Sequence, residues 1–189
     1  MKKVLHVGCG RPHARSLHRI FRSAEWQEVR LDINPDVEPD LIGSIVSMPE
    51  VADASVDAVW SSHNVEHLHA HEVRKALGEF LRVLKPGGFA LVTLPDLQEV
   101  ARHIAADKLE DELYRSPDGP IRPLDIVYGY QPAVATGNLF MAHKTGFTAK
   151  TLGTKMAQAG FRDVRVRRVP SEYALWAVGY RPGGGPGES

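Results

Sequence analysis

Short apolar runs alternate with amphipathic helical patterns along this chain, and this alternation limits the fold more than any other feature. The runs typical of buried strands lie at 4–7, 28–32, 40–43, 56–60, 89–94, 164–169 and 173–180. Patterns typical of helices lie at 12–21, 65–84, 97–113 and 148–159. Strands that alternate with helices predict a mostly parallel sheet with helices on both faces. We therefore expect an α/β, Rossmann-like, doubly wound fold with a seven-stranded sheet.

The length of 189 residues fits one domain, which we place at 1–181. Residues 116–147 follow the fifth strand as a long segment rich in prolines and aromatic side chains, and we expect them to form a substrate lid. We expect a flexible tail at 182–189, where glycine is frequent.

The charges of the chain balance, with 23 Lys and Arg against 23 Asp and Glu, so composition indicates neither a nucleic-acid nor a membrane partner. The single cysteine, Cys9, allows no intrachain disulfide and no cysteine-rich metal site. The apolar run at 4–7 is too short for the core of a signal peptide, so we expect the cytoplasm. The oligomeric state stays open.

Gly8-Cys9-Gly10 follows the first strand, and Asp32 ends the second strand 22 residues after Gly10. Glycines there let a ligand approach the backbone, and an acid at that distance can accept hydrogen bonds from both ribose hydroxyls of a nucleoside. The carboxyl ends of parallel strands meet at one edge of the sheet, so Ser44 and His63 should lie near these residues. The alternatives are an ordinary strand-to-helix turn for the glycines and a turn-forming role for Asp32.

Four segments in this order resemble the class I S-adenosylmethionine-dependent methyltransferases. They are VLHVGCG at 4–10, RLDI at 30–33, VDAVWSSHNVEHL at 56–68 and LRVLKPGG at 81–88. The resemblance covers roughly residues 4–94. The segments DIVYGY at 125–130 and MAHKTGFT at 141–148 resemble a bacterial subgroup of predicted methyltransferases.

The resemblance implies S-adenosyl-L-methionine as cofactor and a role for each matching position. The backbone from Gly8 through Cys9 to Gly10 would hold the methionine end, Asp32 the ribose, and Ile33 would lie against the adenine. The adenine edge would meet Ser44 and Ile45, and the methionyl group and sulfonium would face Ser61, Ser62 and His63. The sequence departs from the family pattern at His6, a cofactor position that is commonly an acid, at Ser44, where Asp is frequent, and at Pro12, where a third glycine often lies.

The expected lid supplies the candidates for chemistry and for binding the methyl acceptor, which we expect to be a small molecule. His143 and Tyr128 are the catalytic candidates, because a histidine titrates near neutral pH. The substrate-binding candidates are Tyr130, Gln131, Asn138 and Lys144 in the lid, and Asp96, which lies outside the lid just beyond the fifth strand. The alternatives are that His143 and Tyr128 only stiffen the lid, and that Asp96 caps the helix that follows it.

Three other functions share parts of this pattern. His63-Asn64-Val65-Glu66-His67 matches the H-x-x-E-H motif of inverted zinc proteases, but it straddles a strand end instead of lying in a helix. We expect Glu66 and His67 to begin a helix and expect no metal. An NAD-linked oxidoreductase would also use the glycines and Asp32, but the third glycine of its fingerprint would fall at His13. A cofactor-binding domain without catalytic activity is the third alternative.

Overall fold

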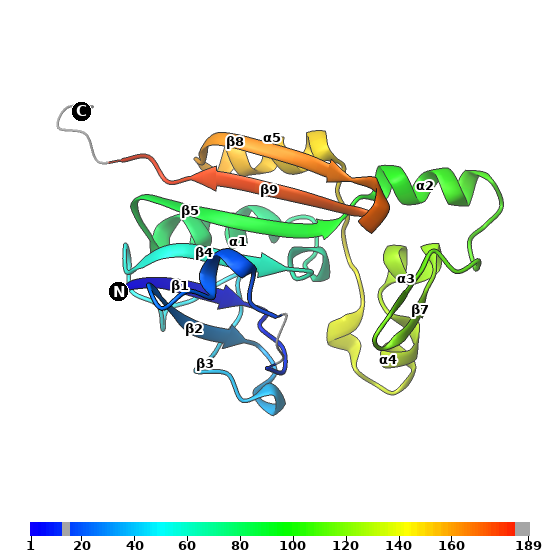
Figure 1. Cartoon of the computed structure of the whole chain (residues 1–189), viewed down its shortest axis with the longest axis horizontal. Coiled ribbons are helices and arrows are strands. Elements are labelled where there is room, and N and C mark those ends of the chain that lie inside the picture. Colours follow the sequence, from blue (N-terminus) through cyan, green and yellow to red (C-terminus); the bar gives the residue numbers. More distant parts are fainter. Residues whose placement is uncertain (13–15, 184–189) are drawn as a thin grey trace.

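A computed structural model describes residues 1–12 and 16–183, and its centre is a seven-stranded sheet (Figure 1). The strand order is β3 (Leu41–Ile42), β2 (Trp26–Asp32), β1 (Lys2–Val7), β4 (Val56–Ser62), β5 (Leu84–Pro95), β9 (Ala174–Tyr180) and β8 (Arg162–Val169). The pairs among β1 to β5 are parallel, while β9 is antiparallel to both of its neighbours. The expected seven-stranded, mostly parallel sheet is confirmed, with the order reversing between β1 and β4.

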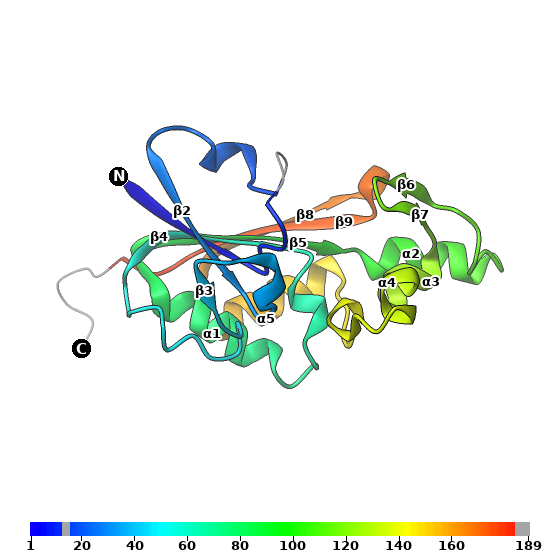
Figure 2. The ribbon, with the colours of Figure 1, turned by 90° about the horizontal axis from the view of Figure 1, so that it is seen from below.

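One face of the sheet is covered by α1 (Val73–Val83) and α5 (Ala149–Ala159), which lie below it in Figure 2. Leu77 and Phe80 of α1 and Leu152 and Met156 of α5 are fully buried in the main apolar core. Thr148 caps the start of α5, and Gly160 ends it with a φ of 109° that favours glycine. This helix is where the sequence predicts it.

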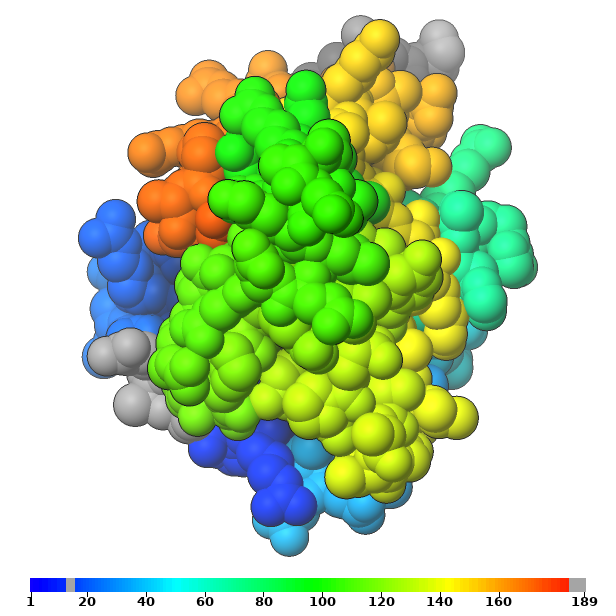
Figure 3. Space-filling view, turned by 90° about the vertical axis from the view of Figure 1, so that its right-hand side faces the viewer, coloured from blue at the N-terminus to red at the C-terminus, as the bar shows by residue number. Residues whose placement is uncertain are grey.

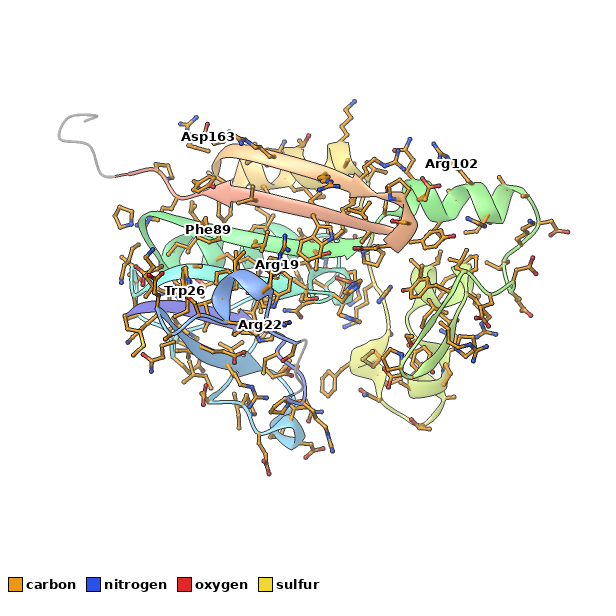
Figure 4. All side chains as sticks on the ribbon, in the orientation of Figure 1. Arg19, Arg22, Trp26, Phe89, Arg102 and Asp163 are labelled. Carbon is orange, nitrogen blue, oxygen red and sulfur yellow. The ribbon has the colours of Figure 1, made fainter. Side chains whose placement is uncertain are left out.

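The opposite face carries only a short 3-10 helix, η1 (Arg19–Phe21), within the described residues between β1 and β2. The helix predicted over 12–21 is therefore wrong for residues 16–21, while residues 13–15 lie outside the described part. His18 has an extended backbone, which interrupts any helix, and its ring accepts a hydrogen bond from Ile20 N. Phe21 packs instead against Trp26 and Phe89, whose side chains Figure 4 labels on this face.

Residues between β5 and α5 extend beyond the carboxyl ends of the central strands and cover this end of the molecule (Figure 3). The segment holds α2 (Leu97–Ala105), β6 (Tyr114–Ser116), β7 (Gly119–Ile121), α3 (Pro123–Tyr128), α4 (Gln131–Ala135) and the 3-10 helix η4 (Leu139–Met141). The strands β6 and β7 form an antiparallel hairpin. The region expected as a lid thus contains short regular elements.

Two predicted helices are shorter than expected. The pattern over 65–84 divides into a 3-10 helix, η3 (Val65–His67), and α1, while α2 ends at Ala105 instead of near residue 113. Further 3-10 helices are η2 (Pro35–Val37) and η5 (Pro170–Glu172). Of the tail expected at 182–189, residues 184–189 lie outside the described part. Among the described residues, every helix is too short or too polar to cross a membrane.

Candidate functional site

A pocket of about 300 Å³ lies at the carboxyl ends of β1, β2 and β4. Its walls come from four parts of the chain: the glycine turn after β1, the end of β2 with η2, the segment after β3, and the segment around η3. Residues of the β5–α5 connection complete it. The lining residues are Gly8, Gly10, Leu31, Asp32, Ile33, Asn34, Val37, Gly43, Ser44, Ile45, His63, Asn64, His67, Leu68, Asn138, Phe140, Met141 and Lys144. We call this the Asp32 pocket.

The glycine turn is shaped by two residues with left-handed backbones. At Gly8 (φ 60°) a Cβ would lie 2.5 Å from Cγ of Asn64, so only glycine fits there. At Gly10 (φ 58°) a Cβ would meet no atom of the described residues within 4 Å, so there is room beside this backbone. Arg30 holds the turn by donating from Nη2 to the carbonyl of Gly10 at 2.7 Å. A ligand could therefore approach the backbone of this turn at Gly10 without meeting a side chain there.

Asp32 also anchors this turn. Its Oδ2 accepts a hydrogen bond from Gly10 N at 2.9 Å, and its Oδ1 accepts one from Asn34 N at 2.9 Å. A carboxylate has about four lone-pair sites, so each oxygen can accept another donor from the pocket. Ile33, whose side chain is largely exposed, offers the pocket an apolar surface beside the acid.

A second pocket, of about 460 Å³, opens on the sheet face that carries η1. It is lined by His18, Arg22, Trp60, Ser62, His63, Thr93, Tyr114, Ser171, Glu172, Ala174 and Trp176. The indoles of Trp60 and Trp176 stack at 5.7 Å, and the ring of His18 lies 5.3 Å from each of them. We call this the aromatic pocket, and Figure 4 labels Arg22 on its side of the sheet.

Among the described residues, His63 is the one that lines both pockets. It directly follows β4 with a left-handed backbone (φ 47°), and its N–H donates to the carbonyl of Thr93. Such strained backbones away from glycine concentrate at functional sites. Nδ1 of His63 lies 3.3 Å from Oε1 of Glu66. Burial alone would lower the pKa of His63, but the Glu66 carboxylate raises it above the usual value.

Glu66 lies among three imidazoles. It is 1% exposed, and neither carboxylate oxygen has a hydrogen-bond partner among the described residues. One ligand atom each of Glu66, His67 and His143 lie within 4.8 Å of one another. Burial would raise the pKa of Glu66, but His63, His67 and His143 hold it below the usual value. Burial lowers the pKa of His143, because it disfavours the charged imidazolium.

The H-x-x-E-H segment straddles a strand end, as expected, because His63 follows β4 and precedes the 3-10 helix η3. The expectation that Glu66 and His67 begin the long helix is wrong, since they lie in η3 and α1 starts at Val73. The third member of the cluster is His143, which the sequence singled out only as a catalytic candidate.

The structure brings Gly8, Gly10, Asp32, Ile33, Ser44, Ile45 and His63 together, as predicted. Four other predicted cofactor residues lie elsewhere. The buried His6 pairs through Nδ1 with Oε1 of Glu28 at 2.6 Å, and burial lowers the pKa of His6. Cys9 is buried, and its N–H donates to the carbonyl of Leu31. Ser61 is fully buried outside the pocket lining, and Ser62 lines the aromatic pocket.

Of the predicted lid residues, Asn138 and Lys144 line the Asp32 pocket. The others line neither pocket. Tyr128 is 60% exposed, Tyr130 donates from its hydroxyl to the carbonyl of Asp118, and Gln131 donates from Nε2 to the carbonyl of Gly129. Asp96 is the N-cap of α2 and pairs with Arg168 at 2.6 Å, so the capping alternative describes its place. His143 donates from Nδ1 to the carbonyl of Ile126 at 2.7 Å.

Sequence reasoning missed Asn64, whose buried Nδ2 has no hydrogen-bond partner among the described residues and which lines the Asp32 pocket. It also missed the whole aromatic pocket. Trp60 and Trp176 lie in strands far apart in the sequence and resemble ordinary core residues there. The one usable signal for Asn64 was its position directly after a strand that ends at the expected site.

Comparison with known proteins gives a consistent result. Residues 5–92 match a family model described as a methyltransferase domain. Dimethylglycine N-methyltransferase of Parasynechococcus marenigrum is 38% identical over 85 residues, which are 43% of this chain and 30% of that protein. This chain thus spans less than a third of that relative.

Solved structures share the fold at low sequence identity. A SAM-dependent methyltransferase from Methanosarcina mazei superposes with a TM-score of 0.61 at 16% identity, covering 96% of this chain and 92% of that one. A SAM-dependent methyltransferase from Archaeoglobus fulgidus gives 0.58 at 16% identity, covering 95% and 86%.

Proposed function

We propose that this chain, which belongs to the class I S-adenosylmethionine-dependent methyltransferases, methylates a small molecule. In this proposal S-adenosylmethionine binds in the Asp32 pocket, and the acceptor binds in the aromatic pocket. The observation that carries the proposal is that the two pockets share one lining residue, His63, which directly follows β4. Methyl donor and acceptor must come together for transfer, and this shared wall is where the proposal places them.

The residues of the Asp32 pocket fit the cofactor. Asp32 would accept the two ribose hydroxyls, and Ile33, Ser44 and Ile45 would surround the adenine. The open backbone at Gly10 leaves room that a side chain would fill, and the unpartnered Nδ2 of Asn64 offers a donor for a carboxylate or hydroxyl. Bound S-adenosylmethionine supplies an electrophilic methyl group on its sulfonium.

The contribution of this chain is positioning. Holding two reactants in line can supply several kcal/mol of the barrier through effective molarity alone. His63 would touch both reactants, and its backbone is fixed by the hydrogen bond to Thr93. Phe140 and Met141 line the Asp32 pocket from the lid and would exclude water from it. Tyr128 and Asp96 have no place in this proposal, because they line neither pocket.

The acceptor pocket combines aromatic rings with one acidic and one basic side chain, Glu172 and Arg22. Aromatic faces and a carboxylate favour a cationic amine, and a guanidinium favours a carboxylate. We therefore propose a small zwitterionic acceptor whose ammonium is recognised here and loses its proton to solvent before transfer. The neutral nitrogen then attacks the methyl carbon, the sulfur–carbon bond breaks, and S-adenosylhomocysteine leaves. The similarity of part of the chain to dimethylglycine N-methyltransferase supports an amine acceptor.

The test is methyl transfer from S-adenosylmethionine labelled on its methyl carbon, with sarcosine, dimethylglycine, other amino acids and catechol as acceptors. We expect label in the amines, no transfer by Asp32→Ala, and a KM for the amine raised about tenfold in Glu172→Gln, equivalent to roughly 1.4 kcal/mol. Transfer to catechol alone would show that the acceptor class is wrong. If every acceptor failed and wild type also failed to bind S-adenosylhomocysteine, the methyltransferase proposal itself would be wrong.

A further inference from the structure

We propose that Glu66, His67 and His143 form a binding site for one divalent transition-metal ion. Among such ions we expect Zn²⁺. The site would join η3, which follows β4, to the lid segment that carries His143. This departs from our expectation from the sequence that the protein holds no metal. It does not rest on the proposed methyl transfer, because its evidence lies in the residues of the cluster alone.

The first observation is the proximity of three ligand types that transition metals prefer. One atom from each of Glu66, His67 and His143 lies within 4.8 Å of the others. Tetrahedral zinc, with bonds of about 2.0–2.2 Å, holds neighbouring ligand atoms roughly 3.3 Å apart. The side chains therefore need to move inward by only about 1.5 Å to bind an ion. Two histidines and one carboxylate form a donor set that leaves a coordination position open.

The second observation is the orientation of the two imidazoles. Nδ1 of His67 lies 3.1 Å from the carbonyl oxygen of Ala142, and Nδ1 of His143 lies 2.7 Å from that of Ile126. A carbonyl oxygen only accepts hydrogen bonds, so each Nδ1 carries its proton. The free nitrogen of each ring is therefore Nε2. Metal-binding histidines characteristically donate their other N–H to a backbone carbonyl in this way.

The third observation is the buried carboxylate itself. Both oxygens of Glu66 lack hydrogen-bond partners in the described part of the chain. His63 approaches Oε1 at 3.3 Å without forming an aligned hydrogen bond. A buried carboxylate without donors is costly, whereas a bound cation would compensate it. The cluster thus brings together three electron-pair donors that one metal ion could bind.

The backbone holds this arrangement from both sides. The N–H groups of Lys144 and Thr145 both donate to the carbonyl of Glu66, at 2.9 and 3.1 Å. His67 also lines the Asp32 pocket, so the site adjoins the proposed cofactor. A bound ion would add a direct link between η3 and the lid at the wall of this pocket.

Metal binding can be measured on the full chain without cofactor or acceptor. After treatment with EDTA and its removal, we would titrate the protein calorimetrically with Zn²⁺ and Mg²⁺ and record Co²⁺ absorption. We expect one Zn²⁺ per chain, visible Co²⁺ bands, and no binding of Mg²⁺, which prefers oxygen ligands. In His143→Ala and Glu66→Gln, the Zn²⁺ affinity should fall by at least about 100-fold. Loss of a residue that only hydrogen-bonds to a metal ligand already costs up to about 100-fold, and these variants lose a ligand itself.

His69→Ala/His71→Ala is the matched control. These two rings stack at 5.7 Å close to the site in sequence, and an exposed histidine pair could itself bind zinc weakly. The double variant should bind Zn²⁺ within about threefold of wild type, a difference under 1 kcal/mol. Far-UV circular dichroism checks that each variant folds, and His67→Asn replaces any variant that does not.

Three results would overturn the proposal: no Zn²⁺ binding by the wild type at micromolar concentrations, unchanged binding in a folded His143→Ala, or loss of binding only in the His69 and His71 variant. Failure of methyl transfer alone would leave the metal site standing, since the titration uses neither methyl donor nor acceptor.

Discussion

Gly8 and Gly10 both adopt left-handed backbones, but they need glycine for different reasons. A Cβ at Gly8 would collide with Asn64, whereas a Cβ at Gly10 would enter empty pocket space. We expect Gly8→Ala to lower the free energy of unfolding by more than the roughly 1–2 kcal/mol that a left-handed alanine costs. Gly10→Ala should cost about that amount and weaken cofactor binding. Chemical denaturation and calorimetry on both variants separate the two effects, and equal stabilities would contradict the steric argument.

Cys9 is protected by its surroundings. It is 5% exposed, and burial raises the pKa of its thiol to about 11. At pH 8 only on the order of one thiol in a thousand is then ionised, and the thiolate is the reactive form. We expect DTNB to react slowly with the native protein and at once in denaturant. Rapid stoichiometric reaction of the native protein would show that the glycine turn is more open than described.

The convergence of Gly8, Gly10 and Asp32 on one pocket was predictable at the residue scale, because these residues follow strands and carry a known pattern. The aromatic pocket was not predictable. Trp60 and Trp176 come together only through the pairing of β4, β5 and β9, and a tryptophan in a strand resembles a core residue. The Glu66 cluster depends on the path of the lid, which no local pattern specifies.

At the scale of elements, Asp96 fixes the start of α2. Its Oδ1 accepts a hydrogen bond from Gln98 N, and its Oδ2 pairs with Arg168, while the side chain is fully buried. We expect Asp96→Ala to cost about 1–3 kcal/mol of unfolding free energy, because it removes the cap of α2 and one of the two carboxylates that pair with Arg168.

Urea denaturation measures this cost, with Asp111→Ala as the control at an exposed aspartate. The control should change the unfolding free energy by less than about 0.5 kcal/mol. Equal effects of the two substitutions would mean that Asp96 does not hold α2.

Strands were easier to predict than helices. The seven strands of the central sheet each contain a short apolar run or an alternating apolar pattern, which the sequence shows directly, whereas β6 and β7 were not predicted. The helix predictions were wrong where local contacts favoured a non-helical backbone. His18 is extended, so the pattern over 16–21 yields only η1. Leu68 is extended after η3, and the carboxylate of Glu72 accepts a hydrogen bond from His69 N, so the turn over 69–72 divides the helix predicted over 65–84.

At the scale of the whole molecule, the sheet and the segment 116–147, which we propose to be a lid, share the Asp32 pocket. Asn138, Phe140, Met141 and Lys144 line it from the lid, whereas the β6–β7 hairpin contributes no residue to it. We expect S-adenosylhomocysteine at about a hundred times its Kd to slow amide exchange in 138–144 by up to about 100-fold. Exchange in 114–121 should change little. Equal slowing in both segments would indicate a global effect instead of a lid contact.

The central claim is that the Asp32 pocket holds the methyl donor. Calorimetric titration of S-adenosylhomocysteine into wild type, Asp32→Ala and Asp36→Ala tests it most directly, because Asp36 lies in the next turn and lines neither pocket. We predict that wild type and Asp36→Ala bind alike, with binding to Asp32→Ala weaker by about 100-fold, since two hydrogen bonds to a carboxylate are lost. Absence of binding to folded wild type, or undiminished binding to Asp32→Ala, would contradict the claim.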